Sequence, residues 1–303
     1  MVLPAWYICG KNRPCDEIEL PTKLIPLQFH FQAHPDMSET IISSLQNTLV
    51  KQVVKLQQKA QERKKQKVFV VEGRRECSLA LKAGNEPLEV FYCPELFAPM
   101  PEYPVDLKKY NGKVRQVSRA VYNKMAYRQD SEGVLMTFSF FSTQLTAIQP
   151  KANPLILALE GVEKPGNLGA ILRTADAASA DAVVICDPLT DVFNPNVIRS
   201  SLGCCFTQQI AVCKPEEFRL WCQQNNIRIM IASVQSDHYY FNANLNQPLA
   251  MVFGTESQGL SQQWYQWADE KLKIPMLGSI DSLNVSASAA IMTFEAVRQR
   301  SSG

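Results

Sequence analysis

Short apolar runs of strand length alternate with stretches of helical periodicity through the second half of the chain. The clearest case lies between Pro154 and Val184, where an apolar run ends in a loop of glycine, proline and asparagine. An alanine-rich helix follows this loop and ends near a second apolar run. Repeated units of this kind are typical of a largely parallel sheet that helices cover on both faces. Besides the alanine-rich helix, the expected elements are strands at 154–160, 183–186, 209–212, 227–232, 249–254 and 271–274, and helices at 195–199, 214–224, 260–267 and 285–300.

The first half of the chain predicts a smaller α/β domain. Residues 1–36 follow neither period and hold five of the prolines, so we interpret them as a disordered tail or as a wrongly assigned start. Ser38-Glu-Thr40 is a capping signature that predicts one helix from Met37 to about Gln66. Further strands are expected at 68–71, 89–92 and 133–140, and helices at 74–83 and 118–127.

The segment 142–154 combines serine, threonine, glutamine and two prolines with little apolar periodicity, which is typical of a linker. We therefore predict a tail at 1–36, a small α/β domain at 37–141, the linker at 142–154 and a second, parallel-sheet domain at 155–303. A chain of 303 residues with 46% apolar content can bury the cores that two domains need.

Composition excludes several classes of protein. No apolar run approaches the roughly 18 to 20 residues that cross a membrane, and no charged start precedes an apolar block as in a signal peptide. Nine cysteines at irregular spacing indicate neither a disulfide framework nor a metal site. We expect a cytoplasmic protein without a metal or a membrane partner. With three histidines outside any nucleophile motif, chemistry that needs a histidine base is disfavoured.

The N-terminal half is the basic half of the chain. Residues 1–150 carry 20 lysines and arginines against 15 acidic residues, and nine of the basic ones lie between Lys51 and Arg75. Such a face is suited to phosphate contact. A charge run of this kind is also what the solvated surface of an ordinary helix shows, so both interpretations stay open.

Polar and glycine residues follow three of the expected strands directly. The three loops are 160–173, 254–260 and 274–286. In the first, Asn167 lies between two glycines, and Arg173 follows in a helix of small apolar residues, which packing alone does not require. Because ligands bind at the carboxyl ends of parallel strands, the loops can converge on one pocket. Each loop taken alone could instead be a tight turn.

Together the three loops closely resemble the motifs of the SpoU (TrmH-type) family of RNA ribose 2'-O-methyltransferases. The first motif stands as Asn167-Leu-Gly-Ala-Ile-Leu-Arg173, and the second as Gly254-Thr-Glu-Ser-Gln-Gly-Leu260. The third stands as Ile274-Pro-Met276 followed by Ser282-Leu-Asn-Val-Ser286. Order and spacing agree over about residues 154–300.

The resemblance implies an α/β fold with a deep trefoil knot, S-adenosylmethionine as cofactor, and a homodimer. It assigns the cofactor to Gly254, Ile274, Met276 and Leu283. It assigns catalysis at the target ribose to Arg173, with Asn167, Glu256, Asn284 and Ser286 arranging the site. Residues 69–73 and 133–135 resemble the edges of a ribosomal-protein-like RNA-binding domain, which turns the basic run into an RNA contact surface with Lys64, Lys65, Lys67 and Arg74.

The predicted function is methylation of a ribose 2'-hydroxyl in structured RNA, with ribosomal RNA favoured over transfer RNA by the two-domain arrangement. A guanidinium hardly deprotonates in a protein, so we expect Arg173 to hold a phosphate and stabilise the developing alkoxide. One alternative is a dinucleotide-binding enzyme with Asp187 as the ribose acid, although the Gly-x-Gly-x-x-Gly is missing. Another is a non-catalytic RNA-binding or ribosome-assembly factor.

Overall fold

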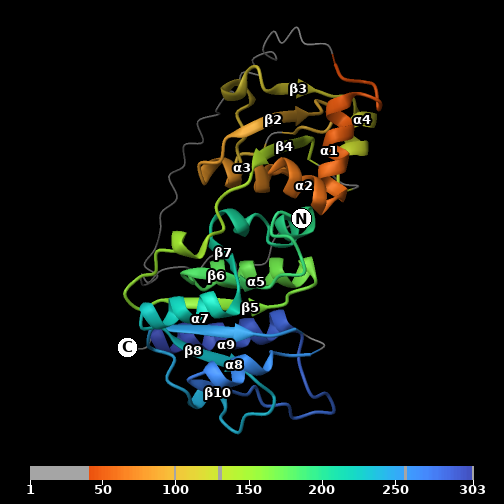
Figure 1. Cartoon of the computed structure of the whole chain (residues 1–303). Helices are drawn as coiled ribbons and strands as arrows, with labels where there is room; N and C mark the ends of the chain where they lie inside the picture. Colours follow the sequence, from red (N-terminus) through yellow and green to blue (C-terminus); the bar gives the residue numbers. More distant parts are fainter. Residues whose placement is uncertain (1–40, 99, 129–131, 256–257, 302–303) are drawn as a thin grey trace, which may run out of the picture. The chain divides into compact units, whose positions relative to one another are not determined.

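Two sheets organise the part of the chain that the computed structural model describes, which is residues 41–98, 100–128, 132–255 and 258–301. The first sheet has the order β1-β4-β2-β3, and the second has the order β10-β8-β9-β5-β6-β7 (Figure 1). The strands are β1 (Val68–Glu72), β2 (Pro87–Tyr92), β3 (Val114–Gln116), β4 (Val134–Ser139), β5 (Leu155–Glu160), β6 (Ala182–Cys186), β7 (Gln209–Cys213), β8 (Arg228–Ala232), β9 (Leu249–Phe253) and β10 (Glu270–Leu272). The α-helices are α1 (Thr48–Gln58), α2 (Ala60–Gln66), α3 (Arg74–Lys82), α4 (Arg119–Met125), α5 (Pro165–Ala177), α6 (Pro195–Ser200), α7 (Pro215–Gln224), α8 (Gln262–Trp267) and α9 (Val285–Ser301).

The N-terminal sheet is mixed. β4 pairs antiparallel with β1 and β2, whereas β3 pairs parallel with β2. Apolar side chains of α1 and α4, among them Val53, Leu56 and Tyr122, are buried against Val70 and Leu135 of this sheet. The strand β3 is absent from the sequence prediction because three residues are too few to show a period.

The helix expected from Met37 to Gln66 is wrong in two respects. Ile42 forms a parallel bridge with Val117, and α1 begins only at Thr48, where the Asn47 side chain accepts a hydrogen bond from the Leu49 N–H at 2.9 Å. The chain is extended at Lys59, which separates α1 from α2. This break lets the Arg63 guanidinium donate to the carbonyls of Leu56 and Gln57, so it caps the end of α1. The capping signature at 38–40 and the tail at 1–36 lie outside the described residues.

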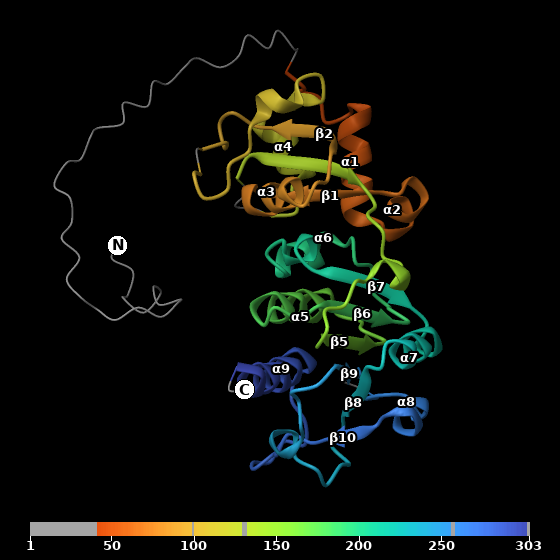
Figure 2. The same ribbon diagram turned by 90° about the vertical axis from the view of Figure 1, so that its left-hand side faces the viewer.

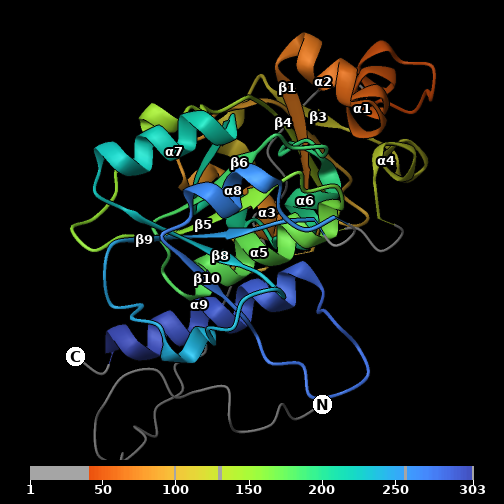
Figure 3. The same ribbon diagram turned by 60° about the horizontal axis from the view of Figure 1, so that its bottom comes forward.

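The C-terminal sheet is parallel throughout its described strands, as predicted. Figure 2 shows α5 and α9 on one face of this sheet and α7 and α8 on the other. Phe218 of α7 and Trp264 of α8 are buried against Ile156, Val184 and Ile231. On the other face, α5 and α9 contact each other along their lengths (Figures 2 and 3). This contact places the start of α9 beside the first turn of α5.

Side chains also connect the two sheets, and the described residues belong to one compact unit. Phe193 stacks on Phe140 with ring centroids 3.8 Å apart and lies 5.0 Å from Phe69. Arg63 Nε is 2.7 Å from Asp191 Oδ2, and both side chains are almost fully buried. Within the described ranges, no helix has the length and apolar character that a membrane crossing needs.

Candidate functional site

A pocket of about 300 Å³ opens at the carboxyl ends of β8 and β9. Its walls come from the loop after β8, the loop after β9, the segment after β10 and the first turn of α9. All four residues predicted to hold a cofactor line this pocket, namely Gly254, Ile274, Met276 and Leu283. Leu260 and Tyr265 also line this pocket.

The loop after β9 turns back on itself so tightly that Gly254 has to be glycine. Thr255 and Gly259 exchange two backbone hydrogen bonds of 3.0 Å each, and the Thr255 hydroxyl accepts the Gln258 N–H at 3.0 Å. Gly259 has a φ of +68°, a conformation that favours glycine. A Cβ at Gly254 would collide with the Gly259 carbonyl group. The predicted site residue Glu256 lies in this loop but outside the described residues.

A second, smaller pocket of about 90 Å³ shares a wall with the first. Phe253, Gly254, Thr255 and Val285 line both pockets. The additional lining of the smaller pocket is mostly polar and comes from the loop after β5 and the start of α5, and it includes Glu160, Glu163, Lys164 and Asn167. The two pockets therefore lie side by side, and the smaller one adds charged and amide side chains of the loop after β5 and of α5 to the shared wall.

Three of the predicted site residues are joined by hydrogen bonds beside the smaller pocket. Asn284 Nδ2 donates to Asn167 Oδ1 at 3.2 Å. Asn284 Oδ1 accepts from the backbone N–H of Ser286 at 3.0 Å and from the Ser286 hydroxyl at 2.5 Å. Asn284 thus also caps α9. The packing of α5 permits this arrangement, since Gly169 lies so close to α6 that a Cβ there would collide with the Ser200 hydroxyl.

Arg173 is exposed and lines neither pocket. It follows Asn167 by six residues on α5, about 9 Å farther along the helix axis. Among the described residues it has no hydrogen-bond or ion-pair partner for its side chain. Its catalytic role therefore stays a prediction.

The predicted RNA contacts separate into two groups. Lys64, Lys65 and Lys67 are exposed. Arg74 is only 5% exposed, and its guanidinium lies 3.9 Å from the centroid of the Phe97 ring. Burial lowers the pKa of Arg74. Arg74 is therefore not available to RNA, and its prediction as an RNA contact is wrong. The sequence could not show this, because a run of basic residues does not reveal which of them are buried.

Glu160 is a site residue to which sequence reasoning gave no role. Its carboxylate accepts the Ser261 backbone N–H and the Ser261 hydroxyl, each at 2.7 Å. This ties the end of β5 to the residue before α8, and so holds the loops after β5 and β9 together. An acid at the end of the strand that precedes the first motif was the available signal.

Asp187, the acid of the dinucleotide alternative, lines neither pocket. Its carboxylate pairs with Lys214 Nζ at 2.6 Å. Within the described ranges, no three histidine, cysteine, aspartate or glutamate side chains gather in a way that could hold a metal ion.

Comparison with known sequences adds independent evidence. Residues 154–294 match the SpoU rRNA Methylase family, and residues 47–136 match the MRM3-like substrate binding domain. The chain is 37% identical over 153 residues to the 23S rRNA (guanosine-2'-O-)-methyltransferase RlmB of Photorhabdus laumondii, an alignment that covers 49% of this chain and 62% of that protein. With RlmB of Vibrio parahaemolyticus it shares 31% identity over 202 residues, which is 64% of this chain and 81% of the relative. The chain thus spans less than two thirds of the first relative.

Solved structures resemble both halves of the chain. The crystal structure of an RNA 2'-O ribose methyltransferase superposes with a TM-score of 0.74 and 35% identity, covering 86% of this chain and 99% of that one. AviRb of Streptomyces viridochromogenes in complex with the cofactor AdoMet gives a TM-score of 0.77 and 26% identity, covering 85% and 100% of the two chains. The chain belongs to the SpoU family of rRNA methylases.

Proposed function

We propose that this chain transfers a methyl group from S-adenosylmethionine to a ribose 2'-hydroxyl of ribosomal RNA. The observation that carries the proposal is the junction of the three motif loops at two adjoining pockets, the smaller lined by Asn167 and the larger by Gly254, Ile274 and Leu283. Relatives named as 23S rRNA (guanosine-2'-O-)-methyltransferases support the same substrate class.

The larger pocket suits S-adenosylmethionine in size and in chemistry. Its volume of about 300 Å³ lies at the lower end of the range for small-molecule sites. Leu260, Ile274 and Leu283 offer apolar contact for a purine face, and the hydroxyls of Ser233 and Tyr265 offer polar contact. A bound cofactor supplies an electrophilic methyl group on a sulfonium. AviRb and an rRNA methyltransferase of Sinorhizobium meliloti have been solved with AdoMet bound.

The smaller pocket would receive the target ribose. Asn167, Asn284 and Ser286 are already held by one another, so they can position a hydroxyl and a neighbouring phosphate without reordering. Alignment of this kind is worth roughly 7 to 11 kcal/mol in well-oriented reactions. We assign Glu256 to the same task.

Arg173 would bind a phosphate of the RNA and stabilise the negative charge that develops on the 2'-oxygen. A guanidinium stays protonated in proteins, so it does not accept the hydroxyl proton. We propose that this proton passes to a phosphate oxygen or to water.

The exposed lysines Lys64, Lys65 and Lys67 would contact RNA phosphates. The match of residues 47–136 to a substrate binding domain supports this assignment. Each phosphate contact releases counterions, so the affinity for RNA should fall as salt is added.

The trefoil knot, the homodimer and the cytoplasmic location belong to the proposal as well. Three large side chains near α9 are exposed to an extent that suits a covered face in a dimer, with Tyr239 at 39%, Phe241 at 45% and Phe294 at 47%.

Seven cysteines in the described part are free thiols, which suits a reducing compartment.

The test is transfer of a radioactive methyl group from S-adenosylmethionine to purified ribosomal and transfer RNA, followed by mapping of bonds that resist alkaline hydrolysis. The proposal expects label at a ribose in ribosomal RNA, because a methylated 2'-oxygen cannot attack its phosphate. Label confined to a base, or RNA binding without any transfer, would overturn it and would favour the non-catalytic alternative.

A further inference from the structure

Three arginines without acidic partners lie where the N-terminal sheet domain meets the C-terminal one. They are Arg75 on α3, Arg173 on α5 and Arg199 on α6. In the part of the chain that the structure describes, none of them forms an ion pair or a side-chain hydrogen bond. Arg173 and Arg199 are exposed, and Arg75 is half-buried, with an Nε that has no hydrogen-bond partner and a guanidinium 5.4 Å from the centroid of the Tyr103 ring. Arg63 at the same junction is instead neutralised by Asp191.

The helices that carry Arg75 and Arg173 both contact the short helix η4 (Cys204–Phe206). The helix α3 approaches Gly203, the residue before η4, so closely that a Cβ there would be 2.8 Å from Leu79 Cδ1. On the other side, the Thr207 hydroxyl donates to Asp176 of α5 at 2.5 Å. Helices α3 and α5 therefore both contact the η4 segment.

Arg75 and Arg173 both act electrostatically on the thiol of Cys204. Burial and the charge of Asp176 raise the pKa of the Cys204 thiol to about 11, whereas the positive charges of Arg75 and Arg173 oppose this rise. Both guanidinium groups are thus within electrostatic reach of one sulfur atom.

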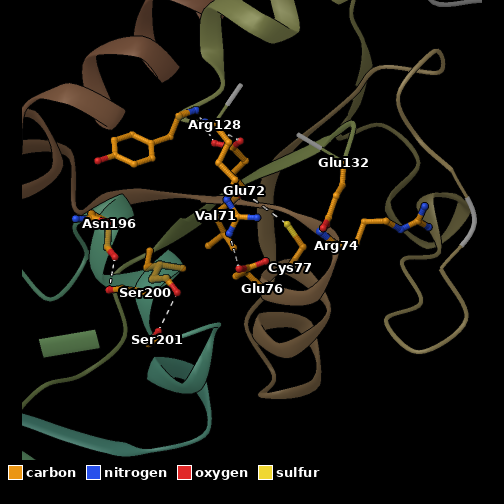
Figure 4. Close-up of polar contacts among 12 residues, drawn as sticks. Val71, Glu72, Arg74, Glu76, Cys77, Arg128, Glu132, Asn196, Ser200 and Ser201 are labelled. Atoms are coloured by element: carbon orange, nitrogen blue, oxygen red, sulfur yellow. Dashed lines mark hydrogen bonds and ion pairs between the residues drawn. The ribbon is translucent and has the colours of Figure 1, made fainter. Parts of the chain in front are cut away.

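Arg199 extends the positive charge toward the N-terminal sheet. It lines a small cavity with Glu72, Tyr127 and Arg128. Figure 4 shows Glu72 beside the backbone of Arg128 and Glu76 beside the Arg128 guanidinium, with Asn196 and Ser200 of α6 at the left. Burial raises the pKa of Glu72, while backbone N–H groups of Tyr127 and Arg128 and the charges of Arg128 and Arg199 lower it.

The acids of this region are already engaged with other partners. Glu72 accepts the backbone N–H groups of Tyr127 and Arg128. Glu76 pairs with Arg128 at 2.8 Å, and Asp176 accepts from Thr207. None of these carboxylates forms an ion pair with Arg75, Arg173 or Arg199, so the three guanidinium groups can donate directly to an anionic ligand.

We infer that Arg75, Arg173 and Arg199 form one phosphate-binding track that carries an RNA strand from the N-terminal domain across η4 to α5. The inference rests on the proposed RNA substrate and adds the path by which the strand reaches Arg173. One guanidinium group can donate two parallel hydrogen bonds to the oxygens of one phosphate. Several arginines can therefore hold successive phosphates of one RNA strand. Arg75 and Arg199 act as positioning residues, since neither lines the pockets where the methyl group would be transferred.

The test compares R75Q and R199Q with K82Q, in which an exposed cation on the same helix as Arg75 is removed. Binding of a fluorescein-labelled single-stranded RNA of about 20 nucleotides is measured by anisotropy across a salt series. Each arginine removed should lower the slope of log affinity against log salt by about 0.7, and the double variant by about 1.4. K82Q should keep the wild-type slope, and R75K should restore it because a lysine retains the charge.

Unchanged slopes in both R75Q and R199Q would overturn the track, provided that circular dichroism and the melting temperature show folded protein. If R75Q does not fold, the salt slopes of R199Q and R75K still test the track. Methyl transfer by the wild-type protein is measured separately. Lowered slopes in the variants without methyl transfer by the wild type would refute the proposed function and support the track. Methyl transfer by the wild type with unchanged slopes in the variants would support the proposed function and refute the track. In the active protein, R75Q should raise KM for ribosomal RNA and leave kcat unchanged.

Discussion

Replacement of Arg300 by methionine should release the C-terminal helix from the rest of its domain. The Arg300 guanidinium donates to four backbone carbonyls, those of Leu245 at 3.1 Å, Asn153 at 2.8 Å, Pro154 at 3.1 Å and Gln247 at 2.6 Å. Methionine keeps much of the apolar stem but none of these donors. Because α9 spans 17 residues, or about 25 Å, this clamp holds the end of the helix opposite to Asn284.

The size of the effect follows from the acceptors that would lose their partner. An unsatisfied buried acceptor costs about 1 to 3 kcal/mol, and this applies to the carbonyl of the buried residue Leu245. The Pro154 carbonyl keeps the Leu249 N–H at 3.0 Å, and water can replace the arginine at exposed Asn153 and half-buried Gln247. We expect a loss of about 2 kcal/mol in the free energy of unfolding, a sizeable part of the roughly 5 to 15 kcal/mol that is usual for a domain.

Urea unfolding measures this directly. The midpoint should fall by about 1 M for R300M with an unchanged m value. R300K should recover only part of the loss, because one ammonium group cannot reach four carbonyls. R298M is the control on the same helix, since Arg298 is exposed and pairs with Glu295 three residues away. A midpoint for R300M equal to that of R298M would refute the clamp.

Three further predictions concern the site and its assembly. R173A should lose methyl transfer by a factor of several hundred, about 3 to 4 kcal/mol, while calorimetry finds S-adenosylmethionine binding intact; more than about a tenth of the wild-type rate would contradict the assignment. G254A should abolish cofactor binding in the same calorimetry because the new methyl group meets the Gly259 carbonyl, whereas G278A, with no heavy atom within 4 Å of the added Cβ, should bind normally. F294D should convert a dimer to a monomer in light scattering, and L220D, equally exposed but on α7, should not; a monomeric wild type would contradict the dimer.

The C-terminal half was predictable because its strands are buried on both faces and therefore appear as uninterrupted apolar runs. The convergence of the motif loops followed from the same property, since parallel strands end at one edge of the sheet. The pocket accordingly contains Gly254, Ile274, Met276 and Leu283 as expected. Which side chains contact one another was not predictable, because the bond between Asn284 and Asn167 joins residues that are 117 positions apart.

The N-terminal half was less predictable for a physical reason that the basic run illustrates. Charge counted along the sequence treats Arg63, Arg74 and Lys64 alike. In the fold, Arg63 caps α1 and pairs with Asp191 of the other domain, and Arg74 lies against Phe97. Both guanidinium groups are unavailable to RNA, because a buried charge has to be neutralised or packed by the protein itself. The exposed lysines remain, as does Arg75, which lies over the Tyr103 ring but has no acidic partner among the described residues, so the RNA surface that this run contributes is smaller than its charge suggests.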